Sequence, residues 1–563
     1  MFITLAGITA SVCWGQLNTG QKVADFQTLA SLYAKQYAPA QWKIQAFNYS
    51  LFKISSWVTQ VQQTTNDLDF YQLMAEYVAS LNDAHSVYIN PSNFEADLGF
   101  SCDIYDGKVL IDYIDRSILP ATKYPFQIGD QVMMVDSQTT DELIQSQSQF
   151  FSDANPRSTS RDAADLIPFR IQAYDPKAEA VGATATVVIQ RQKGNLETYM
   201  IPWQKSGTPL SQIGPSQFPQ IAGKHSRMAP MKNTPTGKPN IRQSLLYLQN
   251  MRLPVKKLIL NFDALPPVFK LPQGFVQRLG NGADYFYSGT YKSGSKTIGY
   301  IRIPDFEASG DYFFVSDAED QFDTEITYMQ QNTDGLVVDV MRNPGGFGCY
   351  AEDLVSRLVT HPFHDLTGQI RPTIYDVQAY QAAVDEAILE EAPTWQIQVL
   401  KSQTNSVTKA YQQGGLTGAL PLCGYSSTRQ PNTDSHGKQA VYGKPILLLT
   451  DEFSASAADI FAAMFQDAKA GKTFGWRTMG AGGAVIDGNV AGYYSEGTAS
   501  VTNTLITRQA PIVSADYPTA PFIENIGVAP DIQNDYMTKS NLLNGGKDFV
   551  SAFTTAILGM IGK

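Results

Sequence analysis

The stretch PILLLTDEFSASAADIFAAMFQ, residues 445–466, runs from a strand through a polar turn into a helix. Its aliphatic run Ile446–Leu449 is typical of a strand that is buried on both faces of a parallel sheet. The polar turn Thr450–Ser454 follows, and alanine-rich helical sequence begins at Ser456. A serine at such a turn presents its Oγ beyond the end of the strand, and the helix aims unpaired N–H groups at the place where an oxyanion forms. Taken alone, the same pattern is more often a simple helix N-cap.

A second strand-and-turn segment, DGLVVDVMRNPGG at residues 334–346, changes that interpretation. Its predicted strand, Leu336–Val340, is followed closely by the pair Gly345-Gly346. Glycines just after a buried strand let the backbone approach a ligand closely and expose its N–H groups. The two segments together supply a nucleophile and a pair of oxyanion donors, which are the two halves of an acyl-transfer site.

Joined to FSASAADIFAAMFQDAKAGKTFGWRTMG at residues 453–480, this segment resembles the tail-specific, or C-terminal processing, serine peptidases. That superfamily includes the tricorn core and the chlamydial protease-like activity factor. The resemblance covers most of residues 81–530. It implies a multidomain α/β protein: a ClpP/crotonase-like α/β catalytic domain, an inserted PDZ-like β-domain and an N-terminal helical domain. It also assigns the nucleophile to Ser456, not Ser454, and the oxyanion donors to the N–H groups of Ala457 and of Gly345 or Gly346.

The base cannot be the lysine that tail-specific peptidases use, because Ala481 stands at the matching position. The segment LNDAHSVYI, residues 81–89, instead resembles the Asp-x-His segment that supplies the base in the tricorn and chlamydial branches, which nominates His85. A neutral imidazole suits proton transfer from a serine near neutral pH. We therefore expect a histidine base and, with it, a third residue that orients the imidazole.

The segment FIENIGVAP, residues 522–530, resembles the Glu-bearing segment of the chlamydial factor and nominates Glu524 as the orienting acid. The resemblance thus implies a triad of Ser456, His85 and Glu524. Should Glu524 not hold His85, three other carboxylates are candidates, in this order: Asp516, Asp531 and Asp83.

The chain divides into blocks of different composition, as expected for 563 residues. The predicted blocks are a signal peptide at 1–15, a helical domain carrying the catalytic His at 16–92, a PDZ-like domain at 93–205, a linker or loop-rich segment at 206–290, and the α/β serine peptidase domain at 291–563. A second loop-rich stretch, Ala392–Lys438, interrupts the last block.

The predicted β-block opens with Leu98-Gly99-Phe100. The segment resembles the apolar-Gly-apolar loop with which PDZ domains bind a peptide's terminal carboxylate on backbone N–H groups. A small β-domain without this function is the alternative. The predicted strands of the block are Lys108–Tyr113, Gln131–Val135, Thr184–Gln190 and Glu197–Ile201.

Charge and hydropathy exclude some classes of partner. The net charge of −11 and the pI near 5.0 speak against nucleic acid or an anionic membrane surface. Residues 1–15 contain no charged side chain and have the length of a secretory signal's apolar region, so a secreted or periplasmic location is expected; a buried N-terminal element is the alternative. No later run is long enough to span a membrane.

Cysteine and histidine usage gives little sign of metal or disulfide chemistry. If residues 1–15 are removed, Cys102, Cys349 and Cys423 remain, which allows one bridge without showing which pair forms it. No spacing of His, Cys, Asp and Glu is typical of a metal site, and no cofactor is expected.

The predicted function is that of a serine endopeptidase that cleaves extended polypeptide substrates through an acyl-enzyme. Two alternatives stay open: a catalytically inactive peptide-binding scaffold of the same fold, and an esterase or acyl transferase that uses the same groups. A homodimer is also left open.

Overall fold

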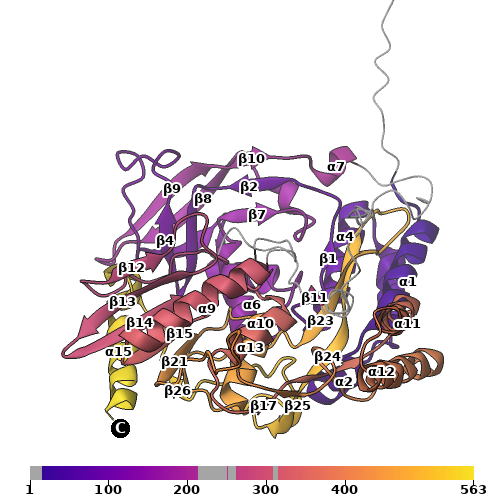
Figure 1. The fold of residues 1–563 in the computed structure, drawn as a ribbon. Coiled ribbons are helices and arrows are strands. Elements are labelled where there is room, and N and C mark those ends of the chain that lie inside the picture. Colours follow the sequence, from indigo (N-terminus) through magenta and orange to yellow (C-terminus); the bar gives the residue numbers. More distant parts are fainter. Residues whose placement is uncertain (1–15, 214–249, 252–261, 309–314, 563) are drawn as a thin grey trace, which may run out of the picture.

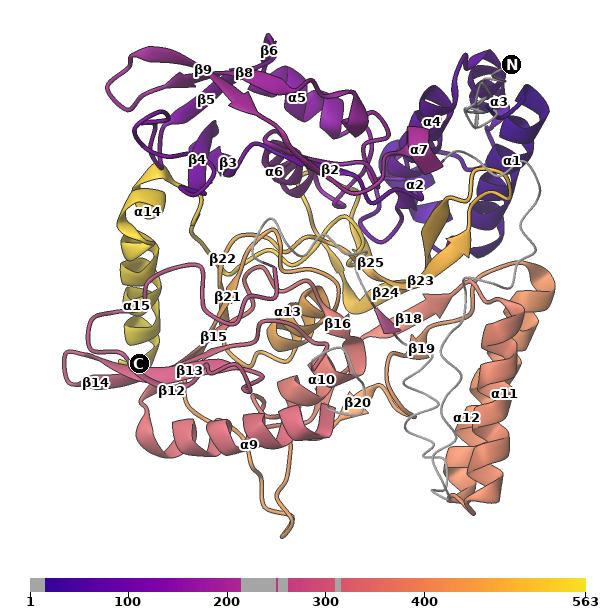
Figure 2. The same cartoon turned by 90° about the horizontal axis from the view of Figure 1, so that it is seen from above.

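The computed structural model describes residues 16–213, 250–251, 262–308 and 315–562 (Figure 1). The predicted signal peptide lies outside these residues, as does most of the predicted linker at 206–290 up to residue 261. Helices near the N-terminus gather on one side, a small β-domain lies beside them, and a larger α/β unit occupies the middle (Figures 1 and 2).

A seven-stranded sheet forms the centre of the α/β unit, in the order β12-β13-β14-β15-β21-β22-β26. Pairing is antiparallel from β12 to β14 and parallel from β14 to β26. The strands are Val276–Leu279 (β12), Tyr287–Ser293 (β13), Lys296–Arg302 (β14), Gly335–Asp339 (β15), Ile446–Thr450 (β21), Lys472–Gly475 (β22) and Ile532–Gln533 (β26). Both strands predicted from the sequence, β15 and β21, are therefore present and adjacent.

Helices cover both faces of this sheet, which explains why β15 and β21 are apolar at every inner position. Leu336, Val338 and Leu448 pack into the cluster that contains α9, α10 and α13. Val337 and Leu447 point to the opposite face and pack against α15. The helices are Val315–Asn332 (α9), Gly348–Ser356 (α10), Ala457–Asp467 (α13), Lys539–Asn544 (α14) and Lys547–Ile561 (α15).

A second sheet is built around the 15-residue strand β24, Thr498–Ile512. β24 pairs with β1, β18, β23 and β25, and β19 extends the sheet beyond β18. These strands are Tyr88–Ile89 (β1), Thr367–Ile370 (β18), Leu420–Pro421 (β19), Gly483–Val490 (β23) and Ala520–Phe522 (β25). Because β1 follows the N-terminal helices in the chain, this sheet joins them to the α/β unit.

The N-terminal helices are Thr19–Gln36 (α1), Ala40–Phe47 (α2), Ser55–Gln63 (α3) and Asp67–Ala79 (α4). α1 begins where the Asn18 side chain accepts a hydrogen bond from the Gln21 N–H, as a helix N-cap should. The buried Tyr33 hydroxyl of α1 donates to the Ser500 carbonyl of β24 at 2.8 Å. A buried polar contact therefore anchors the helices to the second sheet.

The small β-domain has the sheet order β3-β4-β5-β8-β9, with β6 beside β5. Its strands are Phe100–Tyr105 (β3), Lys108–Ile114 (β4), Gln131–Val135 (β5), Gln138–Thr139 (β6), Thr184–Gln190 (β8) and Leu196–Pro202 (β9). All four strands predicted here are confirmed. Glu95–Asp97 (β2), Phe169–Ile171 (β7) and Gln204–Ser206 (β10) form a separate sheet, and the helices are Thr140–Gln147 (α5), Pro156–Asp165 (α6), Ala178–Ala180 (η1) and Leu210–Ile213 (α7).

The prediction of a loop-rich stretch at Ala392–Lys438 is wrong for its first half. That half is the 20-residue helix α12, Thr394–Gln413, which pairs with α11, Ile374–Leu389, in a hairpin at the edge of the molecule (Figure 2). Gln, Ser, Thr and Asn occupy many positions of α12, so few apolar residues mark its helical period. Its buried Leu400 packs on α11, and tertiary contact rather than amphipathic pattern stabilises it.

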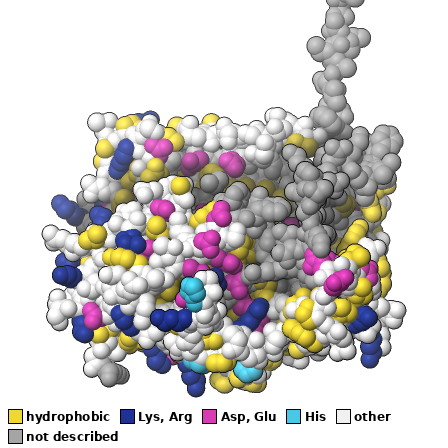
Figure 3. Space-filling view, viewed as in Figure 1, with side chains coloured by type: hydrophobic (Ala, Val, Ile, Leu, Met, Phe, Trp, Pro, Cys, Tyr) yellow, Lys and Arg dark blue, Asp and Glu magenta, His cyan; other side chains and the backbone are white. Residues whose placement is uncertain are grey.

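Charged side chains are unevenly distributed on the face seen in Figure 3. Acidic side chains gather near the middle of that face, whereas most Lys and Arg side chains lie toward its rim. Within the described residues, no helix is both long and apolar enough to cross a membrane.

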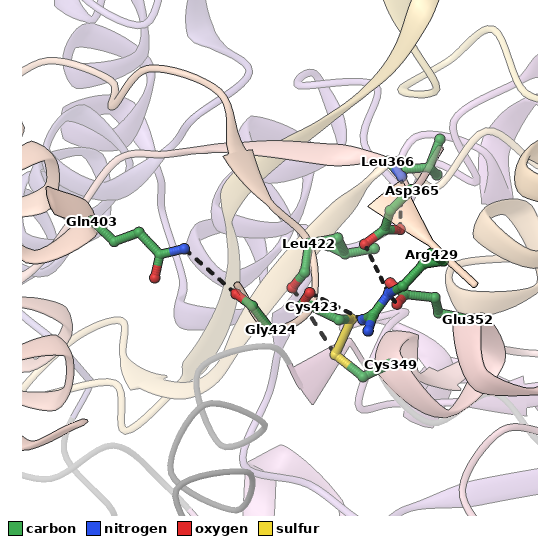
Figure 4. The surroundings of a disulfide bond; sticks show 9 residues. All are labelled: Cys349, Glu352, Asp365, Leu366, Gln403, Leu422, Cys423, Gly424 and Arg429. Atoms are coloured by element: carbon green, nitrogen blue, oxygen red, sulfur yellow. Dashed lines mark hydrogen bonds and ion pairs between the residues drawn. A yellow bond between two sulfur atoms is a disulfide. The ribbon is translucent and has the colours of Figure 1, made fainter. Parts of the chain in front are cut away.

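A disulfide joins Cys349 of α10 to Cys423, which follows β19 (Figure 4). Beside it, Arg429 forms an ion pair with Glu352 and donates to the Cys423 carbonyl. Glu352, Asp365 and Cys423 come close enough to suggest metal ligands, but this sulfur is bonded to Cys349 and the Glu352 carboxylate is paired. Cys102 is buried and free. The pairing left open by the sequence is thus Cys349 with Cys423.

Reducing the disulfide should destabilise the fold. The bridge spans 74 residues of sequence, and a loop of that size contributes up to about 4 kcal/mol in the chain-entropy account. We expect a reductant to lower the midpoint of thermal unfolding of the wild type and of Cys102→Ala, and to leave Cys349→Ser/Cys423→Ser unaffected. An equal midpoint for the wild type with and without reductant would contradict the prediction.

Candidate functional site

The carboxyl ends of β15 and β21 bring the two predicted turns together. Because the strands are parallel neighbours, the segments that follow them emerge at the same edge of the sheet. The Ala455 N–H donates to the Asn343 carbonyl at 2.9 Å, and the Arg342 N–H donates to Asp451 Oδ1 at 2.9 Å. The Ser454 hydroxyl donates to the Val340 carbonyl at 2.8 Å. Ser454 is therefore a structural link between the turns.

Ser456 lies between the second turn and α13 in a strained backbone conformation, with φ 55° and ψ −115°. Its N–H donates to the carboxylate of Asp459, in the first turn of α13, at 3.0 Å. Ala457 is the first residue of the helix, so its N–H has no acceptor within the helix. The serine side chain is thus held at the end of a helix whose first N–H is free of intrahelical bonding.

His85 is the side chain that meets Ser456, with 3.0 Å between its Nε2 and Ser456 Oγ. Its backbone is fixed on both sides: the N–H donates to Asp83 Oδ1 at 2.8 Å, and the carbonyl accepts from the Ser500 hydroxyl of β24 at 2.7 Å. Burial lowers the pKa of His85 to about 4, and the nearby Asp83 carboxylate opposes that shift. The imidazole is therefore neutral at neutral pH, as a general base requires.

Glu524 lies near this pair but makes its hydrogen bonds elsewhere. Its Oε1 accepts from Lys43 Nζ at 2.5 Å, and its Oε2 accepts from the Gly482 N–H at 3.1 Å. No described residue forms a hydrogen bond with His85 Nδ1. Burial raises the pKa of Glu524, repulsion from Asp83 adds to the rise, and Lys43 opposes it.

Asp83, the last of the alternative acids, has a closer connection to His85. Its Oδ1 accepts from the His85 N–H and, at 3.0 Å, from the Thr502 hydroxyl of β24. Asp531 instead binds Thr473, and the exposed Asp516 forms an ion pair with Arg477 at 3.5 Å. Of the three alternatives, the structure brings only Asp83 into contact with the His85 segment.

Ala481, which replaces the lysine of the tail-specific peptidases, contributes a backbone hydrogen bond and no side-chain group. Its N–H and that of Gly480 each donate to the Asp459 carboxylate at 3.0 Å. Burial raises the pKa of Asp459 to about 6, against the effect of these hydrogen bonds. One carboxylate therefore ties this segment to the Ser456 turn without any basic side chain.

Gly345 packs directly against the nucleophile. It has φ +99°, and a Cβ placed on it would lie 2.5 Å from Ser456 Cβ and 2.8 Å from the Ala457 nitrogen. Its own N–H donates to the Asn343 side chain at 2.8 Å. Of the predicted pair of glycines, Gly346 is consequently the better candidate for an oxyanion donor.

An edge beside these glycines accepts an extended chain. Residues Gly346–Phe347 form the short strand β16, and Asn250–Met251 (β11) pair with it in antiparallel fashion. On the other side, the Phe306 N–H donates to the Gly345 carbonyl at 2.7 Å. Within the described residues, β16 therefore has a segment of the chain paired on each of its two sides.

The segment Leu98-Gly99-Phe100 is not an open carboxylate-binding loop in this structure. The Leu98 N–H donates to the Pro168 carbonyl at 3.0 Å, and the Gly99 N–H donates to Asp97 Oδ1 at 2.7 Å. Phe100 is buried and begins β3. The exposed N–H groups that a peptide carboxylate would need are thus already bonded at the first two positions.

Helix α6 covers the edge of β3 and also contacts the serine turn. Arg161 binds Asp103 of β3 at 2.5 Å and Glu452 at 2.9 Å, and all three side chains are buried. Arg157 also pairs with Glu452, and the Ser158 hydroxyl donates to the Glu452 carbonyl at 2.7 Å. Ion pairs and a hydrogen bond thus connect α6 to Glu452, which lies four positions before Ser456.

Sequence reasoning missed Lys43, Arg157 and Arg161. Each is a single basic residue in a helix, and such residues are usually solvated. Buried acidic partners on distant segments make them part of the site, and no spacing in the sequence signals this. The only available clue was the acidic Asp451-Glu452 pair beside the predicted nucleophile.

Comparison with protein families matches two parts of the chain. Residues 297–533 match the model of peptidase family S41, and residues 95–210 match a PDZ domain. A protein of Chlamydia pneumoniae is 23% identical over 598 residues, which cover 96% of this chain and 90% of the relative. A protein of Chlamydia trachomatis serovar D is 23% identical over 591 residues, covering 96% of this chain and 92% of the relative.

Solved structures extend the likeness to the whole fold. Mature CPAF in complex with lactacystin superposes with a TM-score of 0.71 at 21% identity, over 97% of this chain and 99% of CPAF. Mature CPAF alone gives a TM-score of 0.72 at 21% identity, with 97% and 98% coverage. The expected combination of an α/β peptidase domain with a PDZ domain is confirmed. Residues 297–533 thus match peptidase family S41, and the chain as a whole has the overall fold of CPAF.

Proposed function

We propose that this peptidase is an endopeptidase in which Ser456 is the nucleophile, His85 the general base and Glu524 the acid that supports His85. The observation that carries the proposal is the 3.0 Å contact between His85 Nε2 and Ser456 Oγ. The two residues come from segments 371 positions apart and meet within hydrogen-bond distance in a buried site. Such a pairing of a strained serine with a neutral histidine is what nucleophilic acyl transfer requires.

The proposed reaction begins when Ser456 Oγ attacks the carbonyl carbon of a peptide bond while His85 Nε2 takes the hydroxyl proton. The developing oxyanion lies near the N–H groups of Gly346 and Ala457. His85 then protonates the leaving amine, which frees the new N-terminus and leaves an acyl-enzyme on Ser456. A water molecule, deprotonated by His85, hydrolyses that ester and restores the serine.

The substrate is proposed to be an extended polypeptide that pairs with β16. The antiparallel pairing of Asn250–Met251 with Gly346–Phe347 supports this, since a substrate would take the place of that segment beside β16. A carboxylate-specific role for Leu98, Gly99 and Phe100 is less well supported, since the Leu98 and Gly99 N–H groups are bonded within the chain.

Charge compensation at His85 is proposed to come from Glu524 together with Asp83. Asp83 contacts the His85 backbone, and Glu524 contributes a second buried carboxylate close to Asp83. Asp83 favours the imidazolium that forms when His85 accepts the proton, and Glu524 adds to this effect in its ionised form. A secreted or periplasmic location is part of the proposal, and the Cys349–Cys423 disulfide supports it because such bonds persist in oxidising compartments.

Ser456→Ala should abolish proteolysis and leave the fold intact, because it removes one hydroxyl with its hydrogen bond to His85 and keeps the Cβ that lies against Gly345. Ser454→Ala should instead lower the thermal midpoint, because it removes the buried hydrogen bond to the Val340 carbonyl. Digestion of casein followed by mass spectrometry, and labelling with a fluorophosphonate, measure both variants. Labelling without peptide cleavage would favour an esterase or acyl transferase, and loss of activity in Ser454→Ala alone would refute Ser456 as the nucleophile.

Gly345→Ala should reduce turnover by roughly a hundred- to a thousand-fold, the scale seen when an oxyanion site is damaged. The added methyl would collide with Ser456 Cβ and with the Ala457 nitrogen. Gly194→Ala is the matched control, because Gly194 has a similar φ of +95° and nothing within 4 Å of an added Cβ. Equal losses in turnover for the two variants would show that backbone strain, and not the contact with Ser456, is responsible.

The acidic limb of the pH profile should lie lower than that of an ordinary histidine enzyme. His85 acts as a base only when it is neutral, so activity is lost as falling pH protonates it. Because burial lowers the pKa of His85 from 6.5 to about 4, that loss should be centred near pH 4. The profile of kcat/KM against pH measures it. A midpoint at or above the ordinary histidine value, or activity that rises only in the alkaline range, would contradict a buried histidine base.

A further inference from the structure

We propose that Lys43 is a positioning residue that fixes Glu524, together with the His85 segment, in the active arrangement. This inference rests on the proposed function and adds a residue from α2 to it. Lys43 itself is 1% exposed and contacts neither Ser456 nor the imidazole. Its effect on catalysis must therefore pass through the groups that it binds.

All three protons of the Lys43 ammonium are used. Nζ donates to Glu524 Oε1 at 2.5 Å, to the Asn525 side-chain oxygen at 2.6 Å and to the Asn82 carbonyl at 2.8 Å. Asn82 immediately precedes Asp83, and Asn525 immediately follows Glu524. One buried cation is thus bonded both to the segment of the proposed base and to the segment of the proposed acid.

Asn525 completes this connection. Its side-chain oxygen also accepts from the Trp42 indole N–H at 3.0 Å. Its amide donates to the Asn82 carbonyl at 2.7 Å, which is the same carbonyl that Lys43 binds. The turn that leads to His85 is therefore hydrogen-bonded at the Asn82 carbonyl both by Lys43 of α2 and by Asn525, which follows Glu524.

The balance of charge explains why a cation is needed here. Asp83 and Glu524 are both buried, and the Asp83 carboxylate raises the pKa of Glu524. Lys43 is the only Lys or Arg that the described residues place in an ion pair with Glu524. The other titratable groups that interact with these two carboxylates are His85, Tyr33, Tyr37 and Tyr517. Burial and Asp83 raise the pKa of Glu524 to about 8 and Lys43 opposes that rise, so removing Lys43 would disfavour the ionised carboxylate further.

A pH-resolved comparison of full-length variants tests this role. In Lys43→Met, kcat near pH 7 should fall by roughly ten- to a hundred-fold, the scale typical of outer partners of site residues, with KM changed less than about twofold. The loss relative to the wild type should shrink as the pH is raised from 7 into the alkaline range, because Lys43 lowers the pKa of Glu524 and its removal moves the ionisation of Glu524 to higher pH. Glu524→Gln should show no such recovery, and Lys43→Met/Glu524→Gln should be no worse than Glu524→Gln alone.

Lys22→Met is the matched control. Lys22 is also a buried lysine of the N-terminal helices, at 4% exposed, and it pairs with Asp67 at 3.4 Å, but it has no contact with the site residues. We expect this variant to keep wild-type kcat and pH profile even if its thermal midpoint falls. An equal loss of kcat in both lysine variants would reduce the role of Lys43 to general stability and overturn the proposal.

Three further results would overturn it: wild-type kcat in Lys43→Met, a loss that stays constant across this pH range, or losses that multiply in the double variant. If Lys43→Met does not fold, Lys43→Gln, which retains donors for the Asn82 carbonyl, takes its place with the same expectation of alkaline recovery. Fluorophosphonate labelling distinguishes the two proposals. If the wild type is not labelled at Ser456, the proposed function fails; if it is labelled and the lysine variant behaves as wild type, only the role of Lys43 fails.

Discussion

The parallel pairing of β15 with β21 is the constraint on which the rest of the site depends. It places two turns from segments about a hundred residues apart at one sheet edge, where Ala455 binds the Asn343 carbonyl. Both strands are buried on both faces, so a shift in register would misplace apolar side chains on either side. The position of Ser456 relative to Gly345 is therefore set by the hydrophobic core of the sheet.

His85 reaches that edge by a different route. β24 binds the His85 segment through Ser500 and Thr502, while Lys43 and Asn525 hold the same turn from the side of α2. These contacts are polar and buried, and such groups are costly when left without partners. The network accordingly specifies one arrangement of the N-terminal helices against the α/β unit, and the Arg161–Glu452 pair does the same for the small β-domain.

The sequence carried enough information to predict both strands of the site and four strands of the β-domain, and it nominated Ser456 and His85, which the structure places 3.0 Å apart. These features have local signals: an aliphatic run, a strand-to-helix turn, an Asp-x-His segment and alternating strands. The helix α12 was missed because polar residues obscure its period, and the disulfide because pairing depends on the fold. The contacts of Lys43 could not be predicted from the sequence, because its ion-pair partner Glu524 lies 481 residues further along the chain.

The distance in sequence between Ser456 and His85 has a consequence for biosynthesis. Ribosomes make the chain from its N-terminus, so the histidine emerges 371 residues before the serine that it serves, and β24 and Glu524 emerge later still. Contacts of such long range form late and slowly in folding. A chain that ends before β24 therefore lacks part of the site, since Ser500, Thr502 and Glu524 have yet to be made.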